Sequence, residues 1–176
     1  RNAGIANISL DLIYGLPKSA GSSLMIDLRE MIARNPEHIS CYGLTYEPGT
    51  PLDQAMKRAE IFPLDDDDCR DEYDVIRQTL KKAGYVHYEI SNYSRPGMAC
   101  RHNLVYWQGG NYLGIGPAAH SFWQGQRHAN PSDLKAWRKG VDSGQMIQGL
   151  EEPLDPRARA REMLVMGLRV LEGVDS

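Results

Sequence analysis

Residues 8–17 read Ile8-Ser9-Leu10-Asp11-Leu12-Ile13-Tyr14-Gly15-Leu16-Pro17, and the fold class follows from this stretch and its neighbours. Apolar residues alternate with Ser9 and Asp11, which predicts a mostly buried strand that ends at the Gly-Leu-Pro turn. In α/β barrels and open parallel sheets, ligands bind at the carboxyl ends of the strands. Asp11 lies near that end, where a carboxylate can accept hydrogen bonds from both hydroxyls of a ribose. The alternative is a structural aspartate held by loop amides.

The segments after this strand predict an alternation of helices and strands. Ser22 or Ser23 can cap a helix with one apolar stripe, and Asn35-Pro36 ends that helix. Residues 38–45 form the next predicted strand, and a longer helical pattern follows up to residue 83. Strand, helix, strand and helix at this spacing are typical of a parallel α/β sheet or barrel.

The acidic run Asp65-Asp66-Asp67-Asp68 has two interpretations. Acidic side chains at a helix N-terminus, with Lys81-Lys82 at the far end, complement the helix macrodipole by about 0.3–1 kcal/mol each. Gly84 then follows as a glycine just beyond the helix end. The alternative, a metal site, is disfavoured, because the helix pattern already accounts for the charges.

Beyond Gly84 the regular alternation is replaced by a segment rich in Tyr, Gly, Asn, His and Trp. In residues 85–125, short apolar runs such as 104–107 predict short strands and functional loops. Pro131-Ser132-Asp133 begins a helix that runs to about residue 139. A polar stretch with Gly144, Gly149 and Pro153 is interpreted as a linker, and Asp155-Pro156 opens a final helix.

The composition excludes several classes of function. Hydrophobic residues make up 41% and charged residues 24%, which is ordinary for a globular protein. A net charge of −3 gives no general attraction to nucleic acid or anionic membranes, and no apolar run is long enough to cross a bilayer. The three cysteines, Cys41, Cys69 and Cys100, are too widely spaced for a metal knuckle or a disulfide framework, which favours a reducing cytoplasm.

Two histidines are the remaining candidates for binding chemistry. In His102-Asn103-Leu104-Val105-Tyr106-Trp107, an imidazole can ligate heme iron, Asn103 can orient it, and the aromatic rings can pack on a porphyrin. From the residues alone, a strand with aromatic core contacts is the favoured alternative. His120 follows the glycine-rich turn at residues 114–116, where backbone can approach a ligand closely. Neither segment matches a dinucleotide or phosphate-loop motif.

Several of these segments, in this order, resemble one family. They are Ile8–Pro17, Pro36-Glu37-His38-Ile39-Ser40 with Glu47-Pro48-Gly49-Thr50-Pro51, Tyr88-Glu89-Ile90-Ser91-Asn92-Tyr93 with Arg95-Pro96-Gly97, His102–Trp107, and Tyr112-Leu113-Gly114-Ile115-Gly116. Together they are similar to the radical S-adenosylmethionine proteins of the oxygen-independent coproporphyrinogen III oxidase group. The resemblance is close over about residues 7–123.

The resemblance implies the fold and the cofactors. The expected fold is the C-terminal part of a partial (β/α)6 radical S-adenosylmethionine barrel with its extension over residues 1–125. After it we expect a helix and linker over residues 126–154, and then the start of the HemN-type C-terminal domain over residues 155–176. Asp11 matches the family's ribose contact to S-adenosylmethionine, and Thr45 matches a weaker contact. The family's 4Fe–4S cluster is held by an N-terminal C-x3-C-x2-C motif that this sequence lacks. We therefore expect an internal part of a longer protein, with no cluster ligand and no catalytic residue of its own.

Two branches of the group differ in function. His102, Asn103, Tyr106 and Trp107 match the His-Asn-x-x-Tyr-Trp hallmark of the heme-chaperone branch, HemW. That branch binds heme and delivers it to recipient hemoproteins, so these four residues are the expected heme contacts, with His120 as a second candidate ligand. The alternative is oxygen-independent coproporphyrinogen III oxidase, which converts two propionates to vinyl groups.

A third interpretation is that the chain is a folded scaffold without activity of its own. An open strand edge where further barrel strands would pair favours aggregation or a homodimer. Heme and recipient hemoproteins are the expected partners, with neither nucleic acid nor a transmembrane segment.

Overall fold

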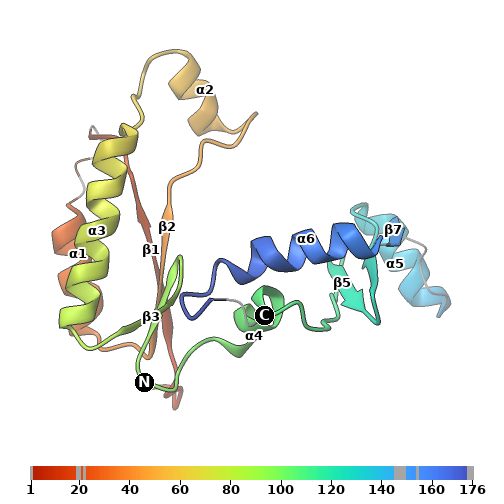
Figure 1. The fold of residues 1–176 in the computed structure, drawn as a ribbon. Coiled ribbons are helices and arrows are strands. Elements are labelled where there is room, and N and C mark those ends of the chain that lie inside the picture. The colour runs from red at the N-terminus through yellow and green to blue at the C-terminus, as the bar shows by residue number, and fades with distance from the viewer. Residues whose placement is uncertain (1, 19–20, 22, 145–149, 154, 174–176) are drawn as a thin grey trace. The chain divides into compact units, whose positions relative to one another are not determined.

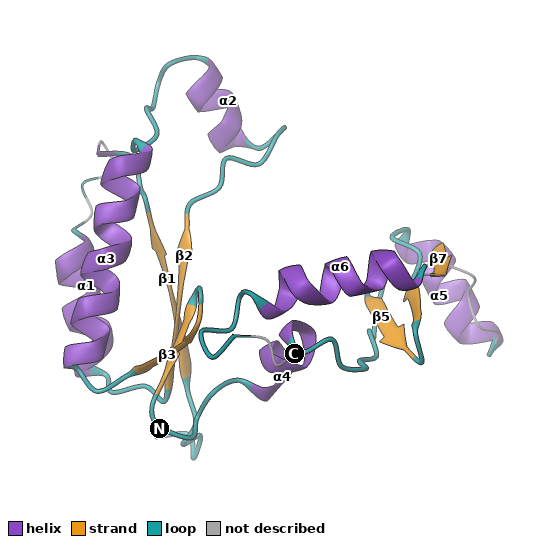
Figure 2. Cartoon of the chain, viewed as in Figure 1, coloured by secondary structure: helices purple, strands orange, loops and turns teal. Residues whose placement is uncertain are grey.

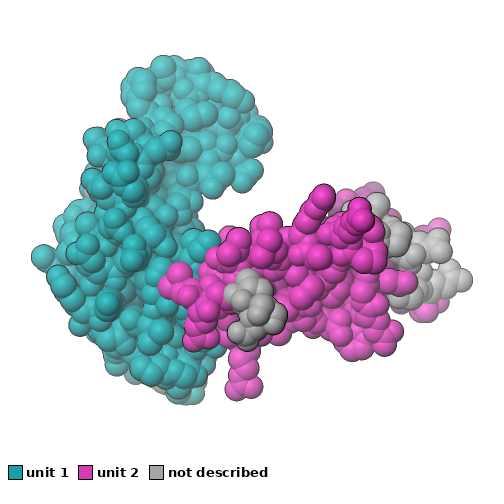
Figure 3. Space-filling model, in the orientation of Figure 1, with its two compact units in different colours: residues 1–100 teal, residues 101–176 magenta. Residues whose placement is uncertain are grey.

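The computed structural model describes residues 2–18, 21, 23–144, 150–153 and 155–173. The chain divides into two compact units, residues 1–100 and residues 101–176, which Figure 3 colours separately. Each unit has its own sheet, with four strands in the first and three in the second. Ser22 and Gly149, named above as a candidate cap and a linker residue, lie outside the described residues.

The first unit is built on a parallel pair of strands. β1 (Ser9–Tyr14) and β2 (His38–Gly43) pair in parallel, with Asp11 opposite Ser40. α1 (Leu24–Ala33) connects them, and α3 (Asp66–Lys82) follows β2, as the sequence predicted. Both helices lie side by side on one face of the sheet (Figure 1).

An antiparallel hairpin completes this sheet. β3 (Val86–Glu89) and β4 (Asn92–Ser94) pair with each other, and β4 also pairs antiparallel with β2, which gives the order β1-β2-β4-β3. β1 is therefore an edge strand within the described sheet, and β3 is the other edge. The mixed sheet (Figure 2) keeps the parallel pair that defines an α/β fold.

The core of this unit lies between the sheet and its two helices. Side chains of one sheet face and of both helices form it: Leu12, Leu28, Ile39, Cys41, Ile76, Leu80, Tyr85 and Tyr93. The expectation that β1 is mostly buried was wrong. Only Leu12 of this strand is buried, while Ile13 is 51% exposed, because the helices cover one face and β1 pairs on one side only.

The acidic run before α3 serves as a helix cap. The Asp65 carboxylate accepts a hydrogen bond from the backbone N–H of Asp68 at 2.7 Å, and Lys18 pairs with the Asp68 carboxylate at 2.7 Å. At the other end, Gly84 has φ +83°, a conformation that glycine adopts without a Cβ penalty. The helix interpretation is confirmed, and among the described residues no group of His, Cys, Asp or Glu is arranged to hold a metal ion.

The sequence analysis missed one helix. α2 (Pro51–Lys57) follows β2, and Thr50 caps it by accepting from the Asp53 N–H at 3.2 Å. Asp53 itself is buried and accepts from the Gly49 N–H and the Lys57 ammonium, both at 2.8 Å. A threonine cap followed by proline at the first helical position is a helix-start signal that was interpreted only as the end of a strand.

The second unit combines short helices with an antiparallel sheet. Its strands are β5 (His120–Trp123), β6 (Gln126–Ala129) and β7 (Leu150–Pro153), in that order. Its helices are α4 (Arg101–Trp107), α5 (Leu134–Ser143) and α6 (Pro156–Gly167). Asp133 caps α5 by accepting from the Ala136 N–H at 2.7 Å, which confirms the helix predicted there. No helix in the described part of the chain is long and apolar enough to span a membrane.

The segment that carries the histidine motif was expected to be a strand and is a helix. Residues 104–107 are β-branched, aromatic or leucine, and this favours a strand by local propensity alone. In the structure, α4 packs against α6, and its helical turn brings the rings of His102 and Tyr106 into an edge-to-face contact. These contacts outweigh a propensity difference that amounts to a few tenths of a kcal/mol per residue.

Candidate functional site

The sheet face of the first unit that points away from α1 and α3 is polar. Side chains alternate along paired strands, so Ser9 and Asp11 of β1 share this face with His38 and Ser40 of β2. We call these four residues, together with Glu89, the polar face. His38, Ser40 and Glu89 are buried, whereas Asp11 is exposed.

A hydrogen-bonded chain runs across the polar face. Ser9 Oγ lies 2.9 Å from His38 Nδ1, and His38 Nε2 lies 2.8 Å from Tyr88 Oη. The same tyrosine oxygen accepts from the backbone N–H of Cys100 at 3.3 Å. Burial lowers the pKa of His38, although Asp11 and Glu89 act in the opposite direction. The imidazole is therefore held neutral, with a partner on each ring nitrogen.

A buried carboxylate closes the other end of this face. Glu89 is fully buried and accepts from the Ser91 N–H at 3.0 Å and from the Asn92 side-chain amide. The Asn92 side-chain oxygen is buried without a hydrogen-bond partner among the described residues.

The structure places the two predicted S-adenosylmethionine contacts on neighbouring strands. Asp11 lies within β1 opposite Ser40, and Thr45 lies beyond Gly43, where β2 ends. Both side chains are exposed. The sequence predicted Asp11 near the carboxyl end of its strand, whereas it is the third of the six residues of β1. Thr45 does lie at the carboxyl edge of the parallel pair, the edge at which ligands bind in this fold class.

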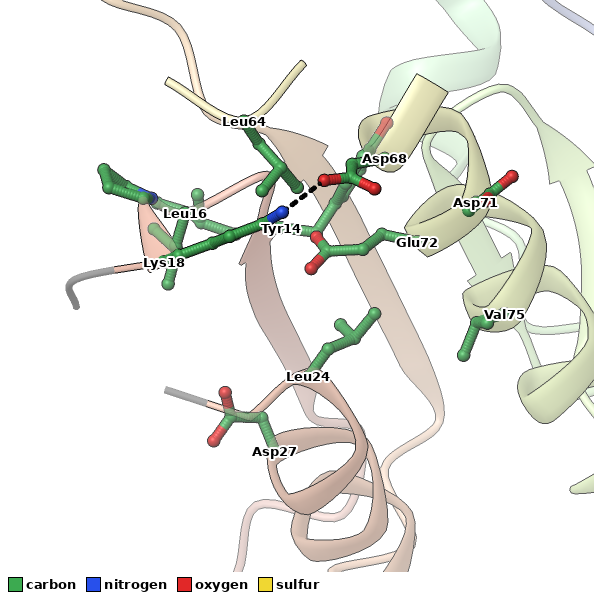
Figure 4. A pocket seen from close by; sticks show the side chains of 12 residues that line it. Tyr14, Leu16, Lys18, Leu24, Asp27, Leu64, Asp68, Asp71, Glu72 and Val75 are labelled. Carbon is green, nitrogen blue, oxygen red and sulfur yellow. Dashed lines mark ion pairs between the residues drawn. The ribbon is translucent and has the colours of Figure 1, made fainter. Parts of the chain in front are cut away.

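A different cavity of about 420 Å³ lies on the helix side of β1 (Figure 4). Two of its acidic side chains have partners close by: Asp68 pairs with Lys18, and Glu72 accepts from the Gly15 N–H at 2.7 Å. Asp11 does not line this cavity. The bonds show that this acidic group orders the turn after β1 and the start of α3.

In the second unit, a row of aromatic rings starts at the histidine motif. Ring centroids are 4.9 Å apart for His102 and Tyr106, 4.3 Å for Tyr106 and Tyr112, and 6.4 Å for Tyr112 and Phe122. We call these four residues the aromatic row. His102 is exposed at one end and Phe122 is buried at the other, so the row passes from solvent into the unit.

A pocket of about 370 Å³ opens along this row. Aromatic, thioether, imidazole and charged side chains line it, namely Tyr106, Tyr112, Phe122, His120, Met163, Met166, Arg127, Arg159 and Glu162. Pockets of this size that combine apolar walls with a few polar groups are typical of small-molecule sites. Tyr106 and His120 thus both line this pocket, and His102 makes an edge-to-face contact with Tyr106.

Trp107 and Asn103 are placed differently. The Arg169 guanidinium lies 4.3 Å from the centre of the Trp107 ring, and neither Trp107 nor Asn103 lines the pocket. The indole Nε1 is buried without a hydrogen-bond partner in the described part of the chain. Sequence reasoning missed the pocket's Arg127, Arg159, Glu162 and methionines, since they are brought together only by the packing of α6 on the strands.

Comparisons with known proteins give consistent results. The chain is 38% identical over 173 residues to the heme chaperone HemW of Synechocystis, which covers 97% of this chain and 42% of that protein. It is 32% identical over 174 residues to HemW of Lactococcus lactis, covering 99% of this chain and 45% of that protein. HemW of Escherichia coli is 44% identical over 117 residues, or 66% of this chain and 30% of that protein.

This chain belongs to the HemW family. It spans less than half the length of the HemW proteins it matches. A zebrafish protein described as radical S-adenosyl methionine domain-containing protein 1, mitochondrial, is 31% identical and covers 95% of this chain and 39% of its own length. No family model matches the chain.

A solved structure confirms the predicted fold class. Coproporphyrinogen III oxidase (HemN) from Escherichia coli, described as a radical SAM enzyme, aligns with a TM-score of 0.73 over 96% of this chain and 41% of that one. The identity is 20%, so the likeness shows the fold alone. The α/β arrangement of this HemW-family chain matches part of the fold of that enzyme.

The residues described do not fit an iron–sulfur cluster. Cys41, Cys69 and Cys100 form no disulfide, and no cluster of metal-binding side chains includes them within the described ranges. Burial raises the pKa of Cys41 to about 12, with a smaller contribution from Asp11, so this thiol is not a ready thiolate ligand.

The buried imidazole leads to a pH prediction. His38 has its pKa lowered by burial, and so does His87, which stacks on Tyr93 with centroids 4.2 Å apart. Unfolding therefore takes up protons, and the free energy of unfolding should fall as pH decreases from about 7 to about 5. In denaturant titrations at several pH values, His38→Gln should reduce the slope of the free energy of unfolding against pH, while the control His128→Gln should not. Equal slopes for His38→Gln and the unchanged protein would contradict the assignment.

Proposed function

We propose that this protein is a heme chaperone whose second unit binds heme for delivery to recipient hemoproteins. The observation that carries the proposal is the aromatic row that leads from exposed His102 into a pocket with His120. The curated relatives described as heme chaperones support it. Aromatic and thioether side chains suit a porphyrin face, and imidazole suits its iron.

Each motif residue has a proposed role. His102 is the iron contact, because its ring is exposed and is held by an edge-to-face contact with Tyr106. His120, at the start of β5, is the second candidate ligand on the same pocket. Tyr106 would pack on the porphyrin. Asn103 would orient the imidazole, and Trp107 would contribute through packing of α4, since Arg169 covers its ring.

We further propose that the first unit contributes to S-adenosylmethionine binding. Asp11 is exposed on the polar face and would accept hydrogen bonds from the ribose hydroxyls, and Thr45 would add a second contact. The name of the zebrafish relative supports the cofactor. The 4Fe–4S cluster implied by the family would be held outside the residues described here. We place the protein in the cytoplasm, where its free cysteines would stay reduced.

The oxidase alternative rests on the fold likeness to coproporphyrinogen III oxidase. At 20% identity this likeness carries no site residue over, whereas the relatives at 32–44% identity are described as heme chaperones. The chaperone function is therefore the better supported of the two.

Replacement of His102 tests the heme proposal. In hemin titrations of the protein, His102→Ala should shift the Soret band and weaken binding by about tenfold, because an axial ligand is lost. His128→Ala, on β6, is the matched control and should bind as the unchanged protein does. An unchanged Soret band and affinity in His102→Ala would reject His102 as the iron contact.

Asp11 is tested in the complete protein with its cluster assembled. Asp11→Ala should weaken S-adenosylmethionine binding by about tenfold, since the ribose loses two acceptor contacts. Asp27→Ala removes a carboxylate from the helix side of the sheet, where it lines the other cavity, and should leave binding unchanged. Equal affinities for the two variants would show that Asp11 does not contact the cofactor.

A further inference from the structure

Two arginines in the pocket of the second unit converge on a single carboxylate. Arg127, on β6, donates to one oxygen of Glu162, and Arg159 donates to the other at 3.0 Å. Glu162 and Arg159 lie on α6, one helical turn apart. Partial burial alone would raise the pKa of Glu162, yet the two arginines lower it, so this carboxylate is charged at neutral pH.

Arg159 is held in place by two further contacts. Its Nη2 donates to the Gly109 carbonyl at 2.6 Å, and its guanidinium lies 4.0 Å from the centre of the Phe122 ring. A Cβ at position 109 would lie 2.7 Å from Nη2 and would displace the guanidinium, and the φ of +65° at Gly109 also favours glycine. The guanidinium is thus oriented before any ligand arrives.

The cluster remains accessible from the pocket. Side-chain exposure is 27% for Arg127 and 21% for both Glu162 and Arg159, and all three line the cavity beside the aromatic row. Both guanidinium groups donate to the same carboxylate at the pocket wall. A planar guanidinium pairs with carboxylates through two parallel hydrogen bonds.

We propose that Arg127 and Arg159 bind a carboxylate arm of the ligand, and that Glu162 occupies them when the pocket has no ligand. The choice of a porphyrin as ligand rests on the proposed function. The incoming carboxylate takes over hydrogen bonds that Glu162 now accepts, while the apolar ring lies along Tyr106 and Tyr112, which line the same pocket. Glu162 then acts as an internal competitor that weakens binding and eases release, which suits a protein that hands its ligand on.

The test separates carboxylate recognition from iron ligation. Metal-free protoporphyrin IX carries two carboxylates, and its dimethyl ester carries none. By fluorescence titration, Arg127→Gln should weaken binding of the diacid by about tenfold and leave binding of the ester unchanged. Glu162→Gln should strengthen binding of the diacid. Damage to the fold would weaken binding, so it cannot explain this result. Arg138→Gln, an exposed arginine of α5 paired with Asp142, is the control and should change neither affinity.

The outcomes distinguish this inference from the proposed function. Suppose that hemin binds in a His102-dependent way while Arg127→Gln and Glu162→Gln leave the ratio of the diacid and ester affinities unchanged. In that case the carboxylate site is wrong and the chaperone function stands. If neither hemin nor the diacid binds to the unchanged protein, both are overturned.

Discussion

The parallel pairing of β1 with β2 is the interaction on which the first unit depends. Its register sets Leu12 and Cys41 on the face that α1 and α3 cover, and Asp11 and Ser40 on the opposite face. The apolar face supplies the core, and the Ser9–His38–Tyr88 chain satisfies buried polar groups on the other. A shift of one residue would exchange the two faces, so packing and the position of Asp11 are fixed together.

The second unit depends on a different kind of contact. Tilted contacts of Tyr112 with Tyr106 and Phe122 join α4 to β5, and the Arg127–Glu162 ion pair joins β6 to α6. The pocket lies between them. The proposed cofactor contacts thus belong to one unit and the proposed heme contacts to the other. Each set of contacts is held by side chains of its own unit, so the effect of a substitution in one unit on ligand binding can be interpreted without reference to the other unit.

Local signals in the sequence predicted most of the first unit, and tertiary contacts explain what was missed. Asp65 and Gly84 mark the ends of α3 by chemistry confined to a few residues, and these predictions were confirmed. The strand expected at 104–107 was wrong, because packing on α6 decides its conformation. The pocket's ion cluster was also missed, since Arg127 and Glu162 are 35 residues apart and no periodic pattern links them. The family resemblance supplied His102, but only the structure showed its neighbours.

Heme binding in the second unit, along the aromatic row, can be located directly by hydrogen–deuterium exchange of the protein with and without hemin. We expect slower exchange in residues 101–107, 120–129 and 156–167, with no change in residues 9–14 and 38–43. Protection confined to the strands of the first unit would contradict it.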